Sequence, residues 1–227
     1  MAVKHSITVL LLWLLLLPFG FGCDPFNTQF DDRERAQLYQ ADSITPPATI
    51  PDSGADLRIM DWNVKFGGGR IDFFFDCHGD EVLMTHAEVL TNMEGLAQKI
   101  AQVDPDILLI QEVDTLSKRS AYVNQVRYLL NHTKLNYAAY ASQWRADYVP
   151  SDGIGKVNSG NAILSKFPIT KAVRIALPLI SEDDALTQYF YLKRNIPHVT
   201  IQIGSREIQV LNTHTSAYSH DGTKKRQ

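Results

Sequence analysis

The stretch Asp106-Ile-Leu-Leu-Ile-Gln-Glu112-Val113 decides how the rest of the sequence is interpreted. Its short, nearly unbroken aliphatic run is typical of a strand buried on both faces of a sheet. The run ends in a carboxylate, and Asp114 and Thr115 then turn the chain. Two interpretations are open for Glu112: a metal ligand at the rim of the sheet, or a solvated residue at which the strand simply stops.

Two other strand-like runs end in polar residues. Residues 57–64 carry Asn63 near their end, and residues 207–215 carry His214. Carboxylate and amide oxygens such as those of Glu112 and Asn63 are the hard donors that Mg²⁺ or Mn²⁺ selects. An imidazole can hydrogen-bond or protonate a phosphoryl oxygen near neutral pH. Spacing alone leaves two classes open, a metal-assisted hydrolase and a generic α/β domain.

The composition is that of an ordinary globular enzyme. The chain has 227 residues, of which 44% are hydrophobic and 21% charged, enough for one sizeable core or part of a larger one. The formal net charge of −3 gives no basic excess for polyanion binding. This disfavours a dedicated nucleic-acid binder but not an enzyme that holds a phosphodiester through a metal.

The N-terminus predicts an export signal over residues 1–22. Lys4 precedes an apolar run over residues 7–17 that Pro18 ends, and this run is shorter than the roughly 20 residues of a membrane span. Cys23 stands where the lipid-modified cysteine of a bacterial lipoprotein would stand. We therefore expect an exported protein, either in the bacterial cell envelope with a lipid anchor in the membrane or secreted after cleavage; an uncleaved anchor is the third alternative.

Residues 23–56 are polar and rich in proline, which predicts a tether from the membrane to the domain, with a short helix over residues 31–40. If Cys23 is acylated, Cys77 is left without a partner; otherwise a Cys23–Cys77 disulfide is an alternative. The folded domain is expected over residues 57–227.

Periodicity within this domain predicts both helices and strands. Apolar residues recur at three- and four-residue steps from His86 to Val103, which is typical of an amphipathic helix. A second helix is expected over residues 121–130. Short loops separate the strand-like runs that follow and favour antiparallel pairing; these runs are residues 137–143, 160–167, 169–177 and 198–203. The pattern is that of an α/β domain with a mixed sheet.

Residues 71–80 contain three consecutive phenylalanines, Phe73 to Phe75, followed by Asp76, His78 and Asp80. The phenylalanines are interpreted as local core or as a loop that dips into a membrane. The polar residues are interpreted as a turn or as cation ligands.

Four segments in chain order resemble motifs of the endonuclease/exonuclease/phosphatase superfamily. They are Trp62-Asn-Val64, Pro105-Asp-Ile-Leu-Leu-Ile-Gln-Glu-Val-Asp114, Ser159-Gly-Asn-Ala-Ile-Leu-Ser-Lys-Phe-Pro-Ile169 and Val210-Leu-Asn-Thr-His-Thr215. Each motif alone is weak, but their combination is specific at the level of the superfamily. The resemblance implies a four-layered α/β/β/α sandwich, with two mixed sheets face to face and helices outside.

The resemblance also implies roles for individual residues. Glu112 would be the principal ligand of Mg²⁺ (or Mn²⁺), Asn63 a contact of the metal or its water, and His214 the catalytic histidine on the scissile phosphate. Asn158 would contact the substrate phosphate. Arg119 would support Glu112 or face the substrate, with a solvated loop arginine as the alternative. The implied reaction is in-line attack of an activated water on phosphorus.

The superfamily's later motifs, Gly-Asp-x-Asn and a closing Asp-His pair, are not found in the sequence. We therefore expect the sequence to be an N-terminal portion of the enzyme, incomplete at its C-terminus and weakly active at most. The alternative is a non-catalytic, surface-anchored binding lipoprotein that keeps the fold. The substrate is expected to be a phosphate ester of nucleic acid, phospholipid or inositol phosphate, and no protein partner is predicted.

Overall fold

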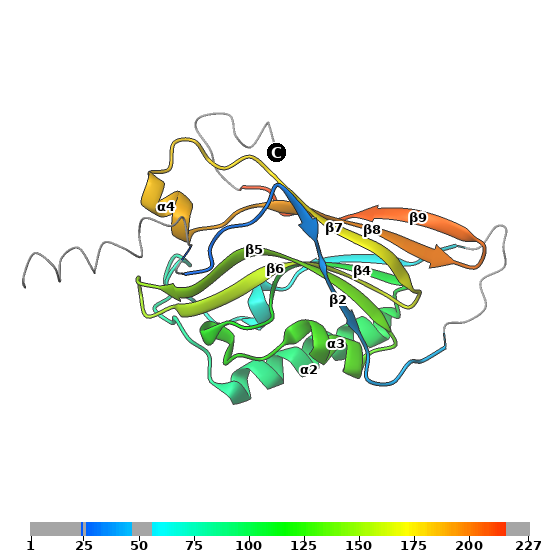
Figure 1. The fold of residues 1–227 in the computed structure, drawn as a ribbon. Helices are drawn as coiled ribbons and strands as arrows, with labels where there is room; N and C mark the ends of the chain where they lie inside the picture. The colour runs from blue at the N-terminus through cyan, green and yellow to red at the C-terminus, as the bar shows by residue number, and fades with distance from the viewer. Residues whose placement is uncertain (1–23, 25, 47–55, 217–227) are drawn as a thin grey trace, which may run out of the picture.

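Two β-sheets lie face to face in the computed structural model, which describes residues 24, 26–46 and 56–216 (Figure 1). The five-stranded sheet has the order β2-β5-β6-β4-β3. Its strands are β2 (Gln37–Gln40), β3 (Ile59–Asn63), β4 (Ile107–Asp114), β5 (Tyr137–Val149) and β6 (Gly155–Ser165). Because β3 and β4 are parallel and the other pairs antiparallel, this sheet is mixed.

The four-stranded sheet is antiparallel throughout its described strands. Its order is β1-β7-β8-β9, with β1 (Arg33–Arg35), β7 (Ile169–Ala176), β8 (Asn195–Ile203) and β9 (Arg206–Leu211). The strands β3 and β9, whose ends carry the site residues, are edge strands of their sheets. The ends of β3, β4 and β9 therefore determine where Asn63, Glu112 and His214 can meet.

Two helices, α2 (His86–Val103) and α3 (Gln125–His132), cover the outer face of the five-stranded sheet (Figure 1). A capping box starts α2: Thr85 accepts a hydrogen bond from the Glu88 N–H, and the Glu88 carboxylate accepts one from the Thr85 N–H, which satisfies two otherwise unpaired donors. Three shorter elements complete the described chain, α4 (Ala185–Phe190) and the 3₁₀ turns η2 (Lys65–Gly67) and η3 (Lys118–Ser120).

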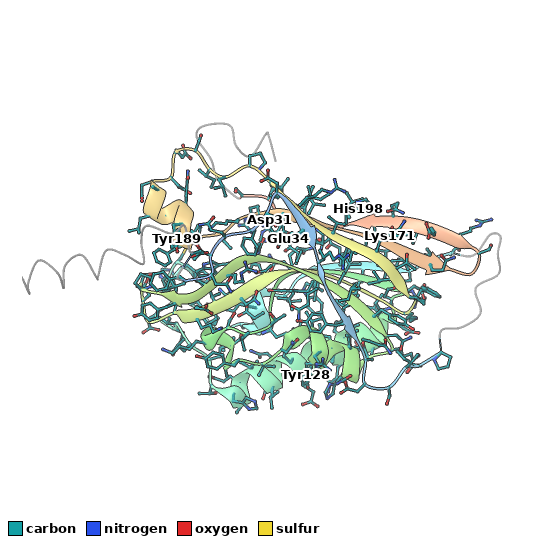
Figure 2. All side chains as sticks on the ribbon, viewed as in Figure 1. Asp31, Glu34, Tyr128, Lys171, Tyr189 and His198 are labelled. Carbon is teal, nitrogen blue, oxygen red and sulfur yellow. The ribbon has the colours of Figure 1, made fainter. Side chains whose placement is uncertain are left out.

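The core lies in two layers, one on each face of the five-stranded sheet. Leu108 and Ile110 of β4 pack toward the helices with Met93 of α2, whereas Ile107 packs between the sheets with Val199. Figure 2 shows side chains filling the helical layer, where Tyr128 lies, and the four-stranded sheet, which carries Lys171 and His198. The aliphatic run before Glu112 is thus buried on both faces, as its composition predicted.

The α/β sandwich with two sheets is confirmed. Of the expected two mixed sheets, one is mixed and the other antiparallel in the described residues. The two longer helices of the described chain both pack on the five-stranded sheet, so these residues build three of the four expected layers.

Part of the expected tether is folded. The short helix expected over residues 31–40 is wrong, because β1 pairs with β7 and β2 pairs with β5. These edge strands hold their place through backbone pairing and the burial of Ala36 between them, so their polar sequence carries no strand signal. Residues 1–22, their expected export signal and Cys23 lie outside the described residues. No helix in the described part of the chain is long and apolar enough to cross a membrane.

The second helix begins later than expected. Ala121 and Tyr122 have φ angles of +50° and +59°, which no α-helix accommodates. Asn124 then caps α3 by accepting a hydrogen bond from the Arg127 N–H. The strands β5 and β6 extend beyond the runs predicted for them, and together they form a long hairpin whose tip is residues 150–154.

Candidate active site

Glu112 lies on a β-bulge rather than at a simple strand end. In β4, Ile110 pairs with Ala162 of β6 and Val113 with Gly160, so three steps on β4 face two on β6. Glu112 has a φ of +55°, a conformation uncommon outside glycine. Bulges and positive φ angles gather at functional sites because they redirect a side chain at an energetic cost.

Asn63 is the last residue of β3, which runs parallel to β4. Its Nδ2 donates to Glu112 Oε1 over 3.1 Å, and its Oδ1 accepts from the Lys65 N–H over 2.9 Å. The amide therefore holds the carboxylate in place from one side, and its own oxygen is occupied by the backbone.

His214 follows β9 and reaches the same carboxylate from the other sheet. Its Nδ1 lies 3.5 Å from Glu112 Oε1 and is buried without a hydrogen-bond partner among the described residues. Burial and the positive charge of Arg194 lower the pKa of the imidazole, against the raising effect of Glu112. The structure thus brings together the three side chains that the sequence placed at strand ends, while their chemical roles stay predictions.

Asn212 joins the two sheets beneath these residues. Its Nδ2 donates to the Ile110 carbonyl over 2.9 Å and the Ala162 carbonyl over 3.0 Å. Its Oδ1 accepts from Gln111 Nε2 over 2.7 Å. Because Asn212 precedes His214 by two residues, this buried bridge fixes the end of β9 against the end of β4.

Arg119 is a buried residue of η3, so the alternative of a solvated loop arginine is wrong. Its side chain donates to both Asp114 oxygens, from Nε over 3.0 Å and Nη2 over 2.9 Å. Nη2 also donates to Ser159 Oγ, and the guanidinium lies 3.8 Å from the centre of the Phe66 ring. Arg119 supports the strand that carries Glu112 and also lines the cavity beside it.

Asn158 is half-buried on β6, with its Oδ1 accepting from the Tyr140 hydroxyl over 2.9 Å. The neighbouring Ser159, whose side chain leaves the strand on the opposite face, lines the cavity that Glu112 lines. Contact of Asn158 with a substrate phosphate therefore stays a prediction, and the position of Asn158 gives it no direct support.

Arg194 is a residue of the site that was not predicted from the sequence. It immediately precedes β8, lines the same cavity as Glu112, and donates from Nη1 to Gln143 Oε1 over 3.2 Å. Burial lowers its pKa, but a guanidinium remains charged at neutral pH. A basic residue just before a strand of the second sheet was the one available signal, and no motif accompanied it.

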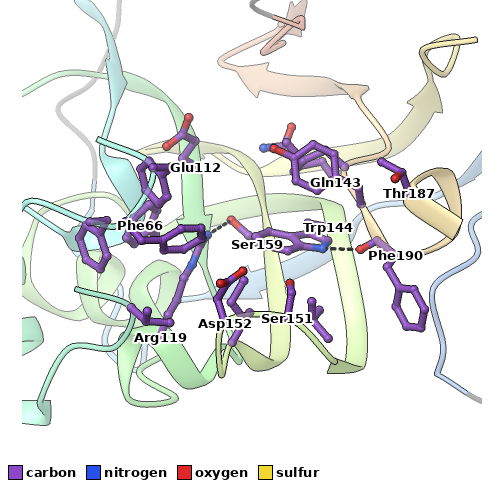
Figure 3. A pocket seen from close by; sticks show the side chains of 18 of the residues that line it. Phe66, Glu112, Arg119, Gln143, Trp144, Ser151, Asp152, Ser159, Thr187 and Phe190 are labelled. Carbon is purple, nitrogen blue, oxygen red and sulfur yellow. Dashed lines mark hydrogen bonds between the residues drawn. The ribbon is translucent and has the colours of Figure 1, made fainter. Parts of the chain in front are cut away.

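The cavity has a volume of about 760 Å³ and opens beside Glu112. Figure 3 shows Glu112 on one wall, the Arg119–Ser159 hydrogen bond on another, and Trp144 bonded to the Phe190 carbonyl opposite. Its lining is mostly aromatic and aliphatic, and its charged groups are Glu112, Arg119, Asp152 and Arg194. The arrangement offers a carboxylate and a cation to a charged ligand and an apolar wall to the remainder.

The donor set fits a weakly chelated divalent cation. Within the described residues no three His, Cys, Asp or Glu side chains cluster as a metal cage. Mg²⁺ seldom needs one, since it keeps most of its waters and takes one or two carboxylates together with substrate oxygens. Glu112 Oε1 accepts a hydrogen bond from Asn63, and the Glu112 side chain is 29% exposed. Lone pairs of the Glu112 carboxylate therefore remain for a cation, and Asn63 is the residue that orients this carboxylate.

Comparisons with known proteins confirm the resemblance. The model of the Endonuclease/Exonuclease/phosphatase family matches residues 62–224. Nocturnin of Drosophila melanogaster is 28% identical over 101 residues, which are 44% of this chain and 15% of that protein. An endonuclease/exonuclease/phosphatase structure from Beutenbergia cavernae aligns with 75% of this chain and 42% of its own, at 18% identity and a TM-score of 0.48. The human Nocturnin catalytic domain with bound sulfate aligns with 83% and 56%, at 16% identity and a TM-score of 0.45.

This chain therefore spans less than two thirds of the length of each of these relatives. The family match, by contrast, covers most of the folded domain and includes the strand ends that carry Asn63, Glu112 and His214. The chain belongs to the endonuclease/exonuclease/phosphatase family.

Proposed function

We propose that the protein is a divalent-metal-dependent hydrolase of phosphate esters, with Glu112 as the residue that binds the metal. The observation that carries the proposal is the convergence of Asn63, His214 and a bulged strand on one carboxylate. Backbone strain at a residue that could otherwise sit in a regular strand supports a role beyond stability. When bound, Mg²⁺ or Mn²⁺ supplies Lewis-acid stabilisation of charge on the phosphoryl oxygens.

The remaining roles belong to side chains around the carboxylate. Asn63 holds Glu112 Oε1 in position through its amide N–H. His214 presents an imidazole whose Nδ1 lies 3.5 Å from Glu112 Oε1, and a protonated ring nitrogen can donate to a phosphoryl oxygen. Arg194 adds a fixed positive charge to the cavity wall, which favours a phosphate there.

Metal binding is the primary test, because it does not require turnover by a chain that lacks Gly-Asp-x-Asn and Asp-His motifs. Binding of Mn²⁺ to the 227-residue protein is measured by electron paramagnetic resonance. We expect Glu112→Gln to weaken the affinity at least tenfold, since the variant loses the charged ligand. Glu94→Gln, at an exposed glutamate of α2, serves as the matched control and should leave the affinity unchanged.

Hydrolysis of bis(p-nitrophenyl) phosphate with Mg²⁺, with and without a chelator, provides the second measurement. Equal Mn²⁺ affinity in the Glu112→Gln and unchanged proteins would contradict the proposal. Mn²⁺ binding without hydrolysis, by this chain and by a longer form that carries further sequence, would favour the non-catalytic surface protein.

We also propose export through residues 1–22, with lipid attachment at Cys23. This rests on the sequence pattern alone. Incorporation of labelled fatty acid into the bacterially expressed protein, and its loss in Cys23→Ser, are the expected results. A protein that takes up no label and stays in the cytoplasm would refute this part of the proposal.

A further inference from the structure

The cavity beside Glu112 is walled by aromatic rings. Seven of its lining residues are aromatic, and they come from three separate segments: residues 66–75, β5, and α4 with the residue after it. The phosphoesterase chemistry proposed above requires only a carboxylate, a metal and cationic side chains. An aromatic wall of this extent therefore indicates that the ligand carries a further group besides its phosphate.

The rings contact one another in fixed orientations, and two of them, Phe75 and Tyr191, are about half exposed. Trp144 is almost buried, and its Nε1 donates to the Phe190 carbonyl over 2.7 Å, which fixes the indole plane. Phe73 and Phe75 stack at 5.7 Å, yet Phe75 is 53% exposed. Tyr191 meets Trp144 edge to face and is 48% exposed. Such a wall is preorganised for an inserted flat ring, because aromatic pairs gain from offset and edge-to-face contact beyond simple area burial.

The segments that line the cavity offer no basic surface to a long anionic partner. Residues 71–82, 149–154 and 181–192, which contribute part of the apolar lining, contain eight Asp or Glu residues and no Lys or Arg. Of the nearby lysines, Lys65 pairs with Asp76, and Lys118 donates to the Gly153 carbonyl. A polynucleotide carries one negative charge per phosphate, and a membrane-binding rim is typically basic. The acidic excess of these segments favours neither, whereas a ligand with a single phosphate can place it on Arg194 and the metal.

Resting on the proposed function, we propose that the substrate is a compact phosphate ester with one flat aromatic ring. The phosphate would lie at Glu112 and Arg194 and the ring between Phe75, Trp144 and Tyr191. A polynucleotide and a membrane lipid are the alternatives, and the binding test separates them from a compact ester.

The test compares the binding of phenyl, cyclohexyl and methyl phosphate to the full chain with Mn²⁺ present, by calorimetry. Cyclohexyl phosphate matches phenyl phosphate in size but offers no π face. We expect phenyl phosphate to bind about tenfold more tightly than methyl phosphate and several-fold more tightly than cyclohexyl phosphate. In Tyr191→Ala the preference for phenyl should fall at least threefold. Tyr122→Ala removes an equally exposed tyrosine outside the cavity lining and should change nothing.

Equal affinity for phenyl and methyl phosphate, or for phenyl and cyclohexyl phosphate, would overturn the inference. So would tight binding to single-stranded DNA or to anionic phospholipid vesicles with no preference among the three small esters. The two proposals fail separately. Hydrolysis of alkyl and aryl diesters with equal kcat/KM keeps the phosphoesterase and overturns the aromatic site, whereas aromatic preference without metal binding or hydrolysis supports the aromatic site and overturns the phosphoesterase.

Discussion

Glycine and alanine substitutions at Glu112 test whether its backbone is strained. Which of the two variants has the higher free energy of unfolding depends on the conformation that the bulge imposes. Glu112 has a φ of +55° in the middle of β4. For a residue with a Cβ this left-handed conformation costs about 1 to 2 kcal/mol, and glycine avoids that cost. Glycine itself costs about 0.5 to 1 kcal/mol relative to alanine in a regular strand, because it loses more conformational freedom on folding.

The strain of the left-handed conformation favours glycine at Glu112, whereas the conformational freedom lost on folding favours alanine, and the larger strain term decides which variant is more stable. Glu112→Ala keeps the strain and removes the carboxylate, while Glu112→Gly removes both. We therefore expect the Glu112→Gly protein to have the higher free energy of unfolding, by about 0.5 to 1 kcal/mol. Both variants should lose Mn²⁺ binding, since neither carries a carboxylate, so stability and metal affinity should separate.

The assay is urea unfolding followed by circular dichroism, with the same pair of substitutions at Glu207 as control. Glu207 is an exposed glutamate in β9 that pairs regularly with Gln202 and has no positive φ. There the alanine variant should be the more stable by about 0.5 to 1 kcal/mol. If alanine is also the more stable at Glu112, the strain argument is refuted and Glu112 lies in ordinary strand geometry.

Two further predictions concern buried charges. Arg119→Met should lower the free energy of unfolding by about 3 to 5 kcal/mol, because it leaves Asp114 buried without its ion-pair partner. As the control, Arg127→Met removes an exposed ion pair and should lower the same free energy by under about 1 kcal/mol. Equal losses of stability in the two variants would contradict the prediction for Arg119. Burial lowers the pKa of Lys193 to about 8, so its destabilising charge disappears from the folded state as pH rises from about 8 toward the unfolded value of about 10.5. Relative to the Lys193→Met variant, the unmodified protein should gain on the order of 3 kcal/mol of stability over that pH window. If the difference in unfolding free energy between the two proteins stays constant from pH 7 to 10, Lys193 is not desolvated.

The elements that sequence predicted well are those whose local signals and tertiary contacts agree. The helix over residues 86–103 has the predicted bounds, because its apolar period, its Thr85 cap and Pro105 after its end all act locally. β4 was equally clear, since a strand buried on both faces requires an aliphatic run. The second helix and the hairpin ends were less accurate because left-handed residues and bulges set them, and sequence shows neither reliably.

The elements that sequence missed depend on partners far along the chain. β1 and β2 are strands only because β7 and β5 offer them free edges, and an edge strand needs little apolar sequence of its own. Arg194 likewise joins the site because β8 brings it beside β5, where Gln143 accepts its hydrogen bond. Neither relation leaves a mark within a short window of sequence.

The bulge explains how one strand can serve both the core and the site. In a regular strand Ile110 and Glu112 would share a face, and Glu112 would point into the apolar layer beneath the helices. With the extra residue, Val113 takes that place instead, and Ile110 and Val113 are both fully buried in the same cluster. Gln111 is left to bind Asn212 between the sheets, while Glu112 faces Asn63 and the cavity. The hydrophobic burial of Val113 thus offsets the strain at Glu112, and the Asn63 amide then holds the carboxylate that the bulge has turned toward the cavity.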